Sequence, residues 1–241
     1  MSCVRVAFIF MGTAGLRERV AAVRSRIAQA CQRCGRDPST VTLVAVTKGV
    51  GAAMIRQAVA CGLTNLGENR VQEARRKQQE IAMVGEVRWH MIGHLQRNKA
   101  KDAVAMFDVI HSVDTHALAE EIERQAAKQG RSVEVLVQVN ISGEANKFGC
   151  APDEAAGLAE AVCRLPHLRL AGLMTIAPFA EDPESVRPIF RQLRQLRDAL
   201  QSAIDNRQST MQLSMGMSQD FEVAVEEGAD YLRVGTALFE T

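Results

Sequence analysis

The sequence predicts an α/β protein that folds as a single TIM-type (β/α)8 barrel with an extra helix at its N-terminus. Short apolar or β-branched runs alternate with helical stretches eight times along the chain. No linker rich in Pro, Gly or Ser divides these units, and a length of 241 residues suits one barrel. A doubly wound open sheet would show the same alternation, so periodicity alone leaves it as the alternative fold.

The chain begins with a short apolar run that we interpret as a leader. Residues 1–13 are expected to be disordered or loosely packed, and the barrel domain is expected over residues 14–241. A secretory signal peptide is disfavoured because Arg5 lies inside the apolar run. A helix is predicted over 16–34, where apolar residues recur at spacings of three and four: Leu16, Val20, Val23 and Ile27.

The strand-and-helix units follow from residue 41 onward. The first strand is a buried β-branched run, and the fifth has the clearest pattern. The eight predicted strands cover residues 41–46, 63–66, 87–92, 109–113, 133–141, 168–174, 211–214 and 231–234. The helices between them are predicted by apolar spacing and by Gly or Pro at their ends, and they cover residues 52–61, 71–81, 96–104, 117–129, 153–164, 184–203 and 221–227.

Composition excludes several classes of protein. Lys plus Arg number 29 against 28 for Asp plus Glu, without a basic block, so nucleic acid is not an expected partner. No apolar run is long enough to span a bilayer, so no membrane association is expected. Six cysteines are too few for a disulfide framework, and the pair Cys31 and Cys34 lacks a second ligand pair for a metal. We expect the reducing cytoplasm as the compartment.

In a barrel of this kind the active site lies at the carboxyl ends of the strands. Applied to the predicted strands, this rule selects the following positions: Lys48 after the first strand, Glu68 and Asn69 after the second, His90, Gly93 and His94 at the third, Asn140 at the fifth, Met174 at the sixth, 214–218 after the seventh and 233–236 at the eighth.

Lys48 is the strongest candidate for covalent chemistry. It continues the first strand directly, so its ammonium group would point into the barrel mouth. A lysine that is partly desolvated has a lowered pKa, and its neutral amine can form a Schiff base with an aldehyde. The structural alternative is a lysine whose stem lies along the strand end while its charge reaches solvent.

Two glycine-bearing loops follow the seventh and eighth strands, which are the loops that build the phosphate site common in barrels. Gly216 and Gly235 would let backbone N–H groups approach an anion closely. Ser218 is expected to cap the short helix that follows, and Thr236 adds a hydroxyl group. Ordinary turns between strand and helix are the structural alternative, so phosphate binding stays a hypothesis at this point.

The sequence resembles the YggS/PROSC-type pyridoxal phosphate homeostasis proteins over nearly the whole chain after the first helix. The matching motifs occur in the order of that family, which makes the resemblance specific. They are LVAVTK at 43–48, GEN at 67–69, VQE at 71–73, WHMIG at 89–93, NISG at 140–143, GLM at 172–174, LSMGMS at 213–218 and RVGT at 233–236.

The resemblance implies pyridoxal 5′-phosphate (PLP) as the cofactor and a barrel similar to the N-terminal domain of bacterial alanine racemase. It implies an internal aldimine on Lys48, phosphate contacts from Ser218, Gly235 and Thr236, and Arg233 facing the pyridine nitrogen. No catalytic or metal-binding residue is predicted. With the strand-end positions included, the predicted cofactor-binding residues are Lys48, Asn69, His90, Met174, Ser214, Gly216, Ser218, Arg233, Gly235 and Thr236.

The resemblance implies a monomeric carrier of PLP without settled catalytic activity, which hands the cofactor to PLP-dependent apoenzymes. One alternative is a PLP-dependent amino-acid racemase, which needs a second acid/base opposite the lysine. The only tyrosine, Tyr231, begins the eighth strand and is expected at the bottom of the barrel, away from the cofactor. The other alternative is a Schiff-base aldolase that acts on phosphorylated substrates through Lys48 and the same phosphate site.

Overall fold

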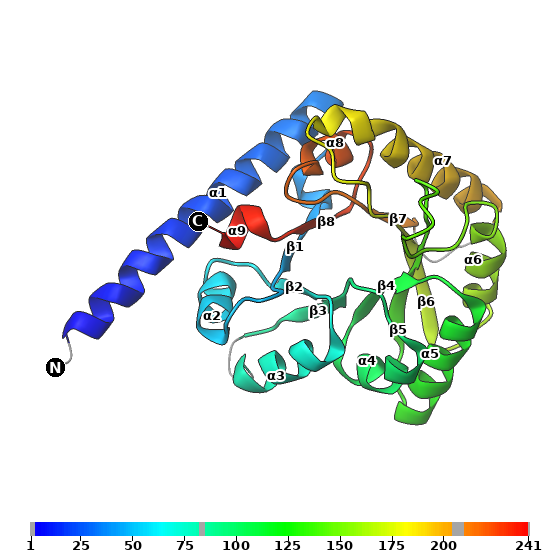
Figure 1. The fold of residues 1–241 in the computed structure, drawn as a ribbon, viewed down its shortest axis with the longest axis horizontal. Helices are drawn as coiled ribbons and strands as arrows, with labels where there is room; N and C mark the ends of the chain where they lie inside the picture. The colour runs from blue at the N-terminus through cyan, green and yellow to red at the C-terminus, as the bar shows by residue number, and fades with distance from the viewer. Residues whose placement is uncertain (1–2, 82–84, 204–209, 241) are drawn as a thin grey trace.

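The structure, a computed structural model, describes residues 3–81, 85–203 and 210–240. Within these residues eight parallel strands close into a barrel in sequence order, and β8 pairs with β1 (Figure 1). Closure confirms the predicted barrel and excludes the open sheet. The strands are β1 (Thr42–Val46), β2 (Asn65–Glu68), β3 (Arg88–Met91), β4 (Val109–Val113), β5 (Val133–Gln138), β6 (Leu168–Met174), β7 (Gln212–Ser214) and β8 (Tyr231–Val234).

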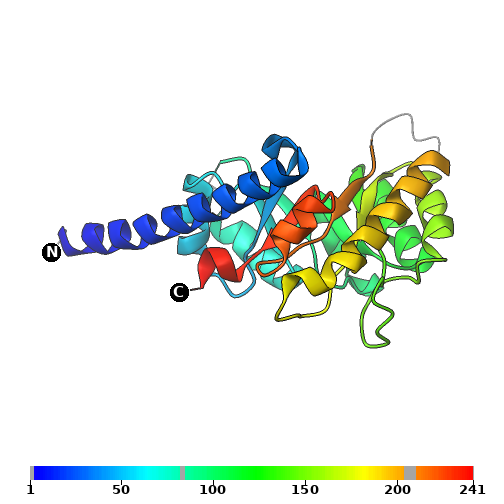
Figure 2. The same ribbon diagram turned by 90° about the horizontal axis from the view of Figure 1, so that it is seen from above.

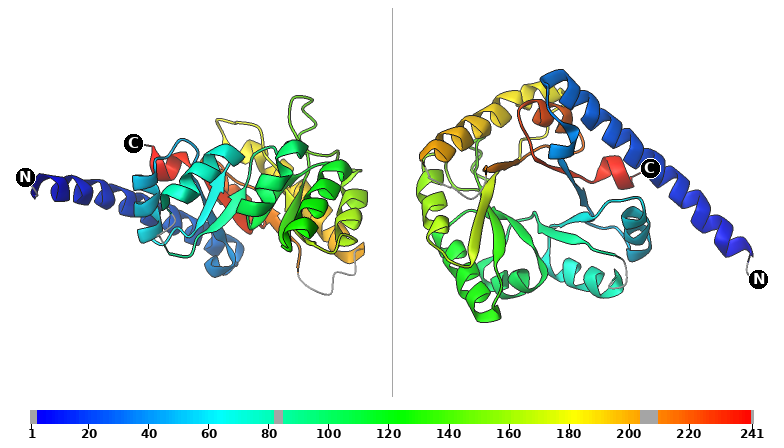
Figure 3. Two further views of the ribbon diagram at one scale, coloured as in Figure 1. Left: turned by 90° about the horizontal axis from the view of Figure 1, so that it is seen from below. Right: turned by 180° about the vertical axis from the view of Figure 1, so that it is seen from behind.

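Helices surround the barrel on its outside, as the right panel of Figure 3 shows. Together with α1 (Cys3–Cys34), they are α2 (Ala52–Ala60), α3 (Val71–Ile81), α4 (Ala100–Met106), α5 (His116–Gln129), α6 (Ala155–Cys163), α7 (Arg187–Ala203), α8 (Phe221–Glu226) and α9 (Thr236–Phe239). The described residues also form three short 3-10 helices: η1 (Pro38–Thr40), η2 (Arg97–Lys99) and η3 (Pro183–Val186). None of the helices among the described residues is long and apolar enough to cross a membrane.

Helix α1 completes the outer layer of the barrel. The helix that follows β8 is only four residues long, and α1 contacts α8, α9 and α2 beside it (Figure 1). The predicted apolar face of α1 is buried, with Leu16, Val20 and Val23 at most 3% exposed. The helix begins at Cys3, so residues 3–13, expected as a disordered leader, are helical here. No proline interrupts the chain between Cys3 and Cys34, and this permits one continuous helix.

Predicted boundaries differ from the structure where backbone constraints outweigh the apolar pattern. The helix expected over 184–203 starts as an α-helix only at Arg187, because Pro188 lacks an N–H and suits a first turn. The strand expected over 133–141 ends at Gln138, and the next residue, Val139, forms an isolated bridge with Cys150. The second strand lies two residues later than predicted and includes Gly67. A Cβ added at Gly67 would lie only 2.9 Å from the Val44 side chain, so there is no space for a larger residue.

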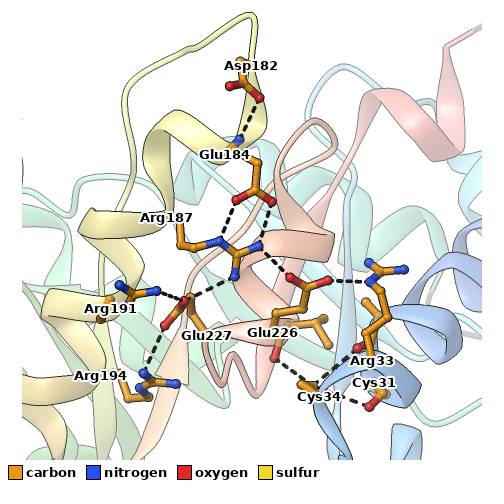
Figure 4. A network of polar contacts seen from close by, with 12 residues as sticks. Cys31, Arg33, Cys34, Asp182, Glu184, Arg187, Arg191, Arg194, Glu226 and Glu227 are labelled. Carbon is orange, nitrogen blue, oxygen red and sulfur yellow. Dashed lines mark hydrogen bonds and ion pairs between the residues drawn. The ribbon is translucent and has the colours of Figure 1, made fainter.

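An ion-pair network ties α7 and α8 to α1 on the outside of the barrel (Figure 4). The Glu226 carboxylate pairs with Arg33 of α1 and Arg187 of α7, at 2.6 Å in both cases. Its neighbour Glu227, with a side chain 4% exposed, pairs with three arginines of α7: Arg187, Arg191 and Arg194. This network holds in place α8, the helix that directly follows the loop after β7.

Two long loops project from the same face of the molecule. Figure 2 and the left panel of Figure 3 show the segments after β5 and β6 extending beyond the barrel there. Phe148, in the segment after β5, stacks on the ring of His94 after β3, with ring centroids 3.8 Å apart. The loop at 146–149 therefore reaches across to the β3 side.

Candidate functional site

Lys48 lies at the carboxyl end of β1, on a cavity of about 590 Å³. The sequence predicts a lysine partly desolvated at the strand end, but Lys48 is exposed and sits in a turn two residues beyond Val46. The turn carries the lysine out of the barrel, so its amine is open to solvent and ligands. Residues from the next two loops share the lining of this cavity, among them Asn69, Arg70, Glu73, His94 and Lys99.

The turn that carries Lys48 is fixed from below by Lys77, which has a fully buried side chain. Lys77 Nζ donates to the carbonyl of Thr47 at 2.5 Å and contacts Glu68 Oε1 at 2.7 Å. The Thr47 hydroxyl donates to the same Glu68 oxygen. On the other side of Lys48, Gly49 N donates to Glu73 Oε1 at 2.8 Å, and Lys77 pairs with that oxygen at 2.6 Å. The residues on both sides of Lys48 are thus anchored to one network.

The two carboxylates of this network differ in electrostatics. Burial raises the pKa of Glu68, although Lys77 and Thr47 oppose this shift. Burial also raises the pKa of Glu73, but the hydrogen bonds from Lys77 and Gly49 and the nearby positive charges outweigh it, so this pKa is lowered overall. Glu73, which also lines the cavity, is therefore ionised at neutral pH and already neutralised by Lys77.

A cup of backbone donors lies beside β1, where β8 ends. The N–H groups of Gly235 and Ala237 converge on Ser218 Oγ, at 3.2 and 3.3 Å. Gly235 packs against Val46. A Cβ added at this glycine would lie 3.3 Å from the Val46 Cβ. Two N–H groups aimed at one oxygen form an arrangement that can bind an oxygen of an anion. The cup is therefore next to the strand end that leads to Lys48.

The loop after β7 brings Ser218 to this cup. Gly216 has φ +91°, and a Cβ there would lie 2.5 Å from the Ala224 Cβ, so only glycine lets α8 pack this closely. The expectation that Ser218 caps α8 is wrong: the N-cap is Asp220, and its carboxylate instead accepts from Met217 N at 2.6 Å. Thr236 is the exposed first residue of α9.

Arg233 is fully buried in the barrel and held by oxygen atoms. Nη1 donates to Ser214 Oγ at 2.6 Å, and Nη2 donates to the carbonyl of Thr175 at 2.8 Å. No carboxylate forms an ion pair with Arg233 among the residues that the structure describes. Burial lowers the pKa of Arg233 to about 10, while Asp220 opposes the shift. The guanidinium group is still cationic at neutral pH.

A chain of hydrogen bonds continues from Arg233 through the barrel interior. Ser214 Oγ is 2.8 Å from His111 Nδ1, His111 Nε2 is 2.9 Å from His90 Nδ1, and His90 Nε2 is 3.0 Å from Asn65 Oδ1. All these contacts are satisfied if Ser214 donates to His111 and each histidine donates through Nε2. This assignment needs both histidines neutral. Burial lowers the pKa of His90 to about 3 and that of His111 well below its ordinary value.

The structure divides the predicted cofactor residues into four groups. Lys48 and Asn69 line the cavity, and Gly216, Ser218, Gly235 and Thr236 form the cup and its loops. Ser214 and Arg233 lie under the mouth in the hydrogen-bonded chain. His90 and Met174 are fully buried inside the barrel. Tyr231 is 3% exposed and packs edge-on against both histidine rings.

Sequence reasoning missed Lys77 and His111, although both had a signal. Lys77 falls on the apolar face of α3 that is formed by Val71, Ala74 and Ile81, which predicts a buried position. His111 lies two residues after Val109 in β4. Because side chains two apart in a strand point to the same side, His111 points into the barrel interior like Val109.

Comparisons with known proteins show which family this chain is similar to. Residues 19–241 match the family described as alanine racemase, N-terminal domain. The pyridoxal phosphate homeostasis protein of Aquifex aeolicus is 45% identical over 222 residues, which cover 92% of this chain and 96% of that protein. Its counterpart from Pseudomonas aeruginosa is 44% identical, with 93% and 94% covered. PipY of Synechococcus elongatus, solved with PLP bound, is 40% identical with a TM-score of 0.81, covering 93% of this chain and 99% of PipY.

The closed barrel and the match over residues 19–241 define the class of this protein: a (β/α)8 barrel of the alanine racemase N-terminal type. Within this class, the chain belongs to the family of pyridoxal phosphate homeostasis proteins.

Proposed function

We propose that this protein binds PLP through Lys48 and holds it for delivery inside the cell. The observation that carries this proposal is the placement of Lys48 and the cup on adjacent strands, joined by the contact of Gly235 with Val46. An aldehyde and a phosphate on one small molecule require these two features side by side. When bound, PLP supplies a reactive aldehyde and an electron-withdrawing ring.

The residues of the cup suit the phosphate group of PLP. The N–H groups of Gly235 and Ala237 already converge on one oxygen, that of Ser218, and a phosphate oxygen could share them. We assign phosphate contacts to Ser218, Gly235 and Thr236, and the place beside the pyridine nitrogen to Arg233. Because Arg233 can only donate hydrogen bonds, it favours an unprotonated ring nitrogen. That form stabilises carbanions poorly, which suits a carrier.

The position of Tyr231 also supports a role without catalytic turnover. A racemase needs an acid/base on the face opposite the lysine, and Tyr231 is enclosed by the rings of His90 and His111 inside the barrel. We infer that the protein works as a monomer in the cytoplasm and passes PLP to PLP-dependent apoenzymes. Relatives named pyridoxal phosphate homeostasis proteins support this role.

A transfer assay tests the proposed function. PLP-loaded protein is mixed with the apo form of a PLP-dependent transaminase, and the recovery of transaminase activity is followed with a Lys48→Ala preparation as control. We expect recovery only with loaded wild-type protein, and no conversion of L-alanine to D-alanine by that protein alone. Sustained racemisation that depends on Lys48 would contradict the carrier role.

A further inference from the structure

The cavity beside Lys48 carries more positive charge than the proposed carrier role requires. Lys48, Arg70 and Lys99 line it, and none of the three forms an ion pair or a side-chain hydrogen bond with any residue in the described part of the chain. The acidic residue in the lining, Glu73, is bound by Lys77 and Gly49 N. His94 Nδ1 lies 3.6 Å from the carboxylate of Asp114, which is outside the lining. The charge left over at the cavity is therefore positive.

The backbone adds to this potential. Helix α3 has eleven residues, and its first residues, Val71 and Gln72, line the same cavity. The N–H groups of a first turn have no acceptor within the helix and favour an anion. The loops after β2 and β3 approach each other closely at Gly93. A side chain at this position would collide with the Asn69 backbone. The positive groups from the loops after β2 and β3 are thus gathered at one place.

The position of this cavity differs from that of the phosphate cup. Strand order places β2 and β3 on one side of β1, and β8 and β7 on the other. Lys48, at the end of β1, therefore lies between the cup and the cavity. A ligand whose phosphate lies in the cup and whose aldehyde meets Lys48 leaves the cavity free for a second molecule that approaches the same aldehyde.

We propose that this cavity is a subsite for the carboxylate of a free amino acid, formed by Arg70 and Lys99, and that amino acids release PLP through it. This inference rests on the proposed function. The amine of the amino acid forms the new C=N bond to the aldehyde carbon of PLP, and the C=N bond to Lys48 breaks. The two protons that the entering nitrogen loses are balanced by those that the Lys48 amine regains. No oxidant or reductant is needed.

The test compares two amines on PLP-loaded protein, L-alanine and ethylamine, at equal concentrations of unprotonated amine. The loss of PLP from Lys48 is followed by absorption, and borohydride trapping with mass analysis measures how much pyridoxyl group remains on Lys48. Since a charge-assisted contact of the carboxylate is made only by alanine, we expect alanine to act at about tenfold lower concentration. Propionate should compete with alanine and leave ethylamine unaffected.

Matched variants assign the effect to the cavity. Arg70→Gln and Lys99→Gln should each remove most of the alanine preference. Arg76→Gln, on the exposed side of α3, and Lys101→Gln, which lies outside the lining, should keep it. Equal action of alanine and ethylamine on wild-type protein, or a preference that survives both cavity variants, would overturn the subsite. Wild-type protein that retains no PLP on Lys48 before any amine is added would instead refute the proposed function.

Discussion

Lys77 and Glu68 form an ion pair with no exposed side-chain surface, and Lys77 Nζ lies 2.7 Å from Glu68 Oε1. The same Nζ contacts the carbonyl of Thr47 and the carboxylate of Glu73. Glu68 Oε2 is buried and has no hydrogen-bond partner among the residues that the structure describes. A buried pair of this kind gives little net stability against an apolar substitute, but leaving one member unpaired is costly. Its clearest structural consequence is the fixed position of the turn around Lys48.

Lys77→Met should lower the free energy of unfolding by about 3–5 kcal/mol, because it leaves Glu68 as a buried charge without its partner. Urea unfolding measures this change. Arg76→Met, one position earlier and 62% exposed, should change stability by less than about 0.5 kcal/mol. The double variant Lys77→Met/Glu68→Leu should be more stable than the single one. A single variant as stable as wild type would show that the pair is dispensable.

The buried histidines should make stability fall in mild acid. His90 and His111 have lowered pKa values in the folded state, about 3 for His90, whereas both titrate near 6.5 when unfolded. Below pH 6.5 the unfolded chain therefore binds protons that the folded protein excludes. Each histidine should contribute a slope of about 1.4 kcal/mol per pH unit to the free energy of unfolding.

Urea unfolding at a series of pH values between about 5 and 7 checks this slope. The contribution of His90 and His111 to the free energy of unfolding should be complete above pH 6.5 and decline steadily as the pH falls. His116→Gln, which changes an exposed histidine, should leave the slope as it is. A wild-type stability that does not depend on pH in this range would show that His90 and His111 bind protons in the folded protein.

Ser218→Ala should weaken PLP binding about tenfold, because it removes a hydroxyl that we assign to the phosphate group. The dissociation constant can be measured by fluorescence or absorption titration. Thr236→Ala should also weaken binding, whereas Ser202→Ala, at an exposed serine of α7, should not. If neither cup variant binds PLP more weakly than wild type, the phosphate lies elsewhere.

Arg233→Glu should shift the spectrum of bound PLP towards the form with a protonated ring nitrogen, since a carboxylate accepts a hydrogen bond that arginine cannot. The Arg233 side chain is buried, so Arg233→Gln serves as a second variant whose amide oxygen can also accept. Side reactions with added amino acids should increase in parallel. An unchanged spectrum in both folded, PLP-loaded variants would show that Arg233 does not contact the ring.

The barrel could be predicted from the sequence because its strands and helices each carry a local pattern. The helix over 71–81 and the strands over 109–113 and 168–174 have the predicted boundaries. Contacts between residues distant in sequence could not be predicted. The link of Ser214 to His111 joins residues 103 positions apart, and the exposure of Lys48 depends on a turn anchored by Lys77. Such contacts follow from barrel closure, which no local pattern encodes.

The central claim is that Lys48 carries the cofactor, and borohydride reduction tests it most directly. Purified protein loaded with PLP is reduced, digested and analysed by peptide mass spectrometry, with Lys99→Gln as a control that keeps Lys48. The account predicts the pyridoxyl group on the peptide that contains Lys48, in wild type and control alike, and loss of visible absorption on reduction. A pyridoxyl group found only on another lysine, or full labelling of a Lys48→Ala variant, would contradict it.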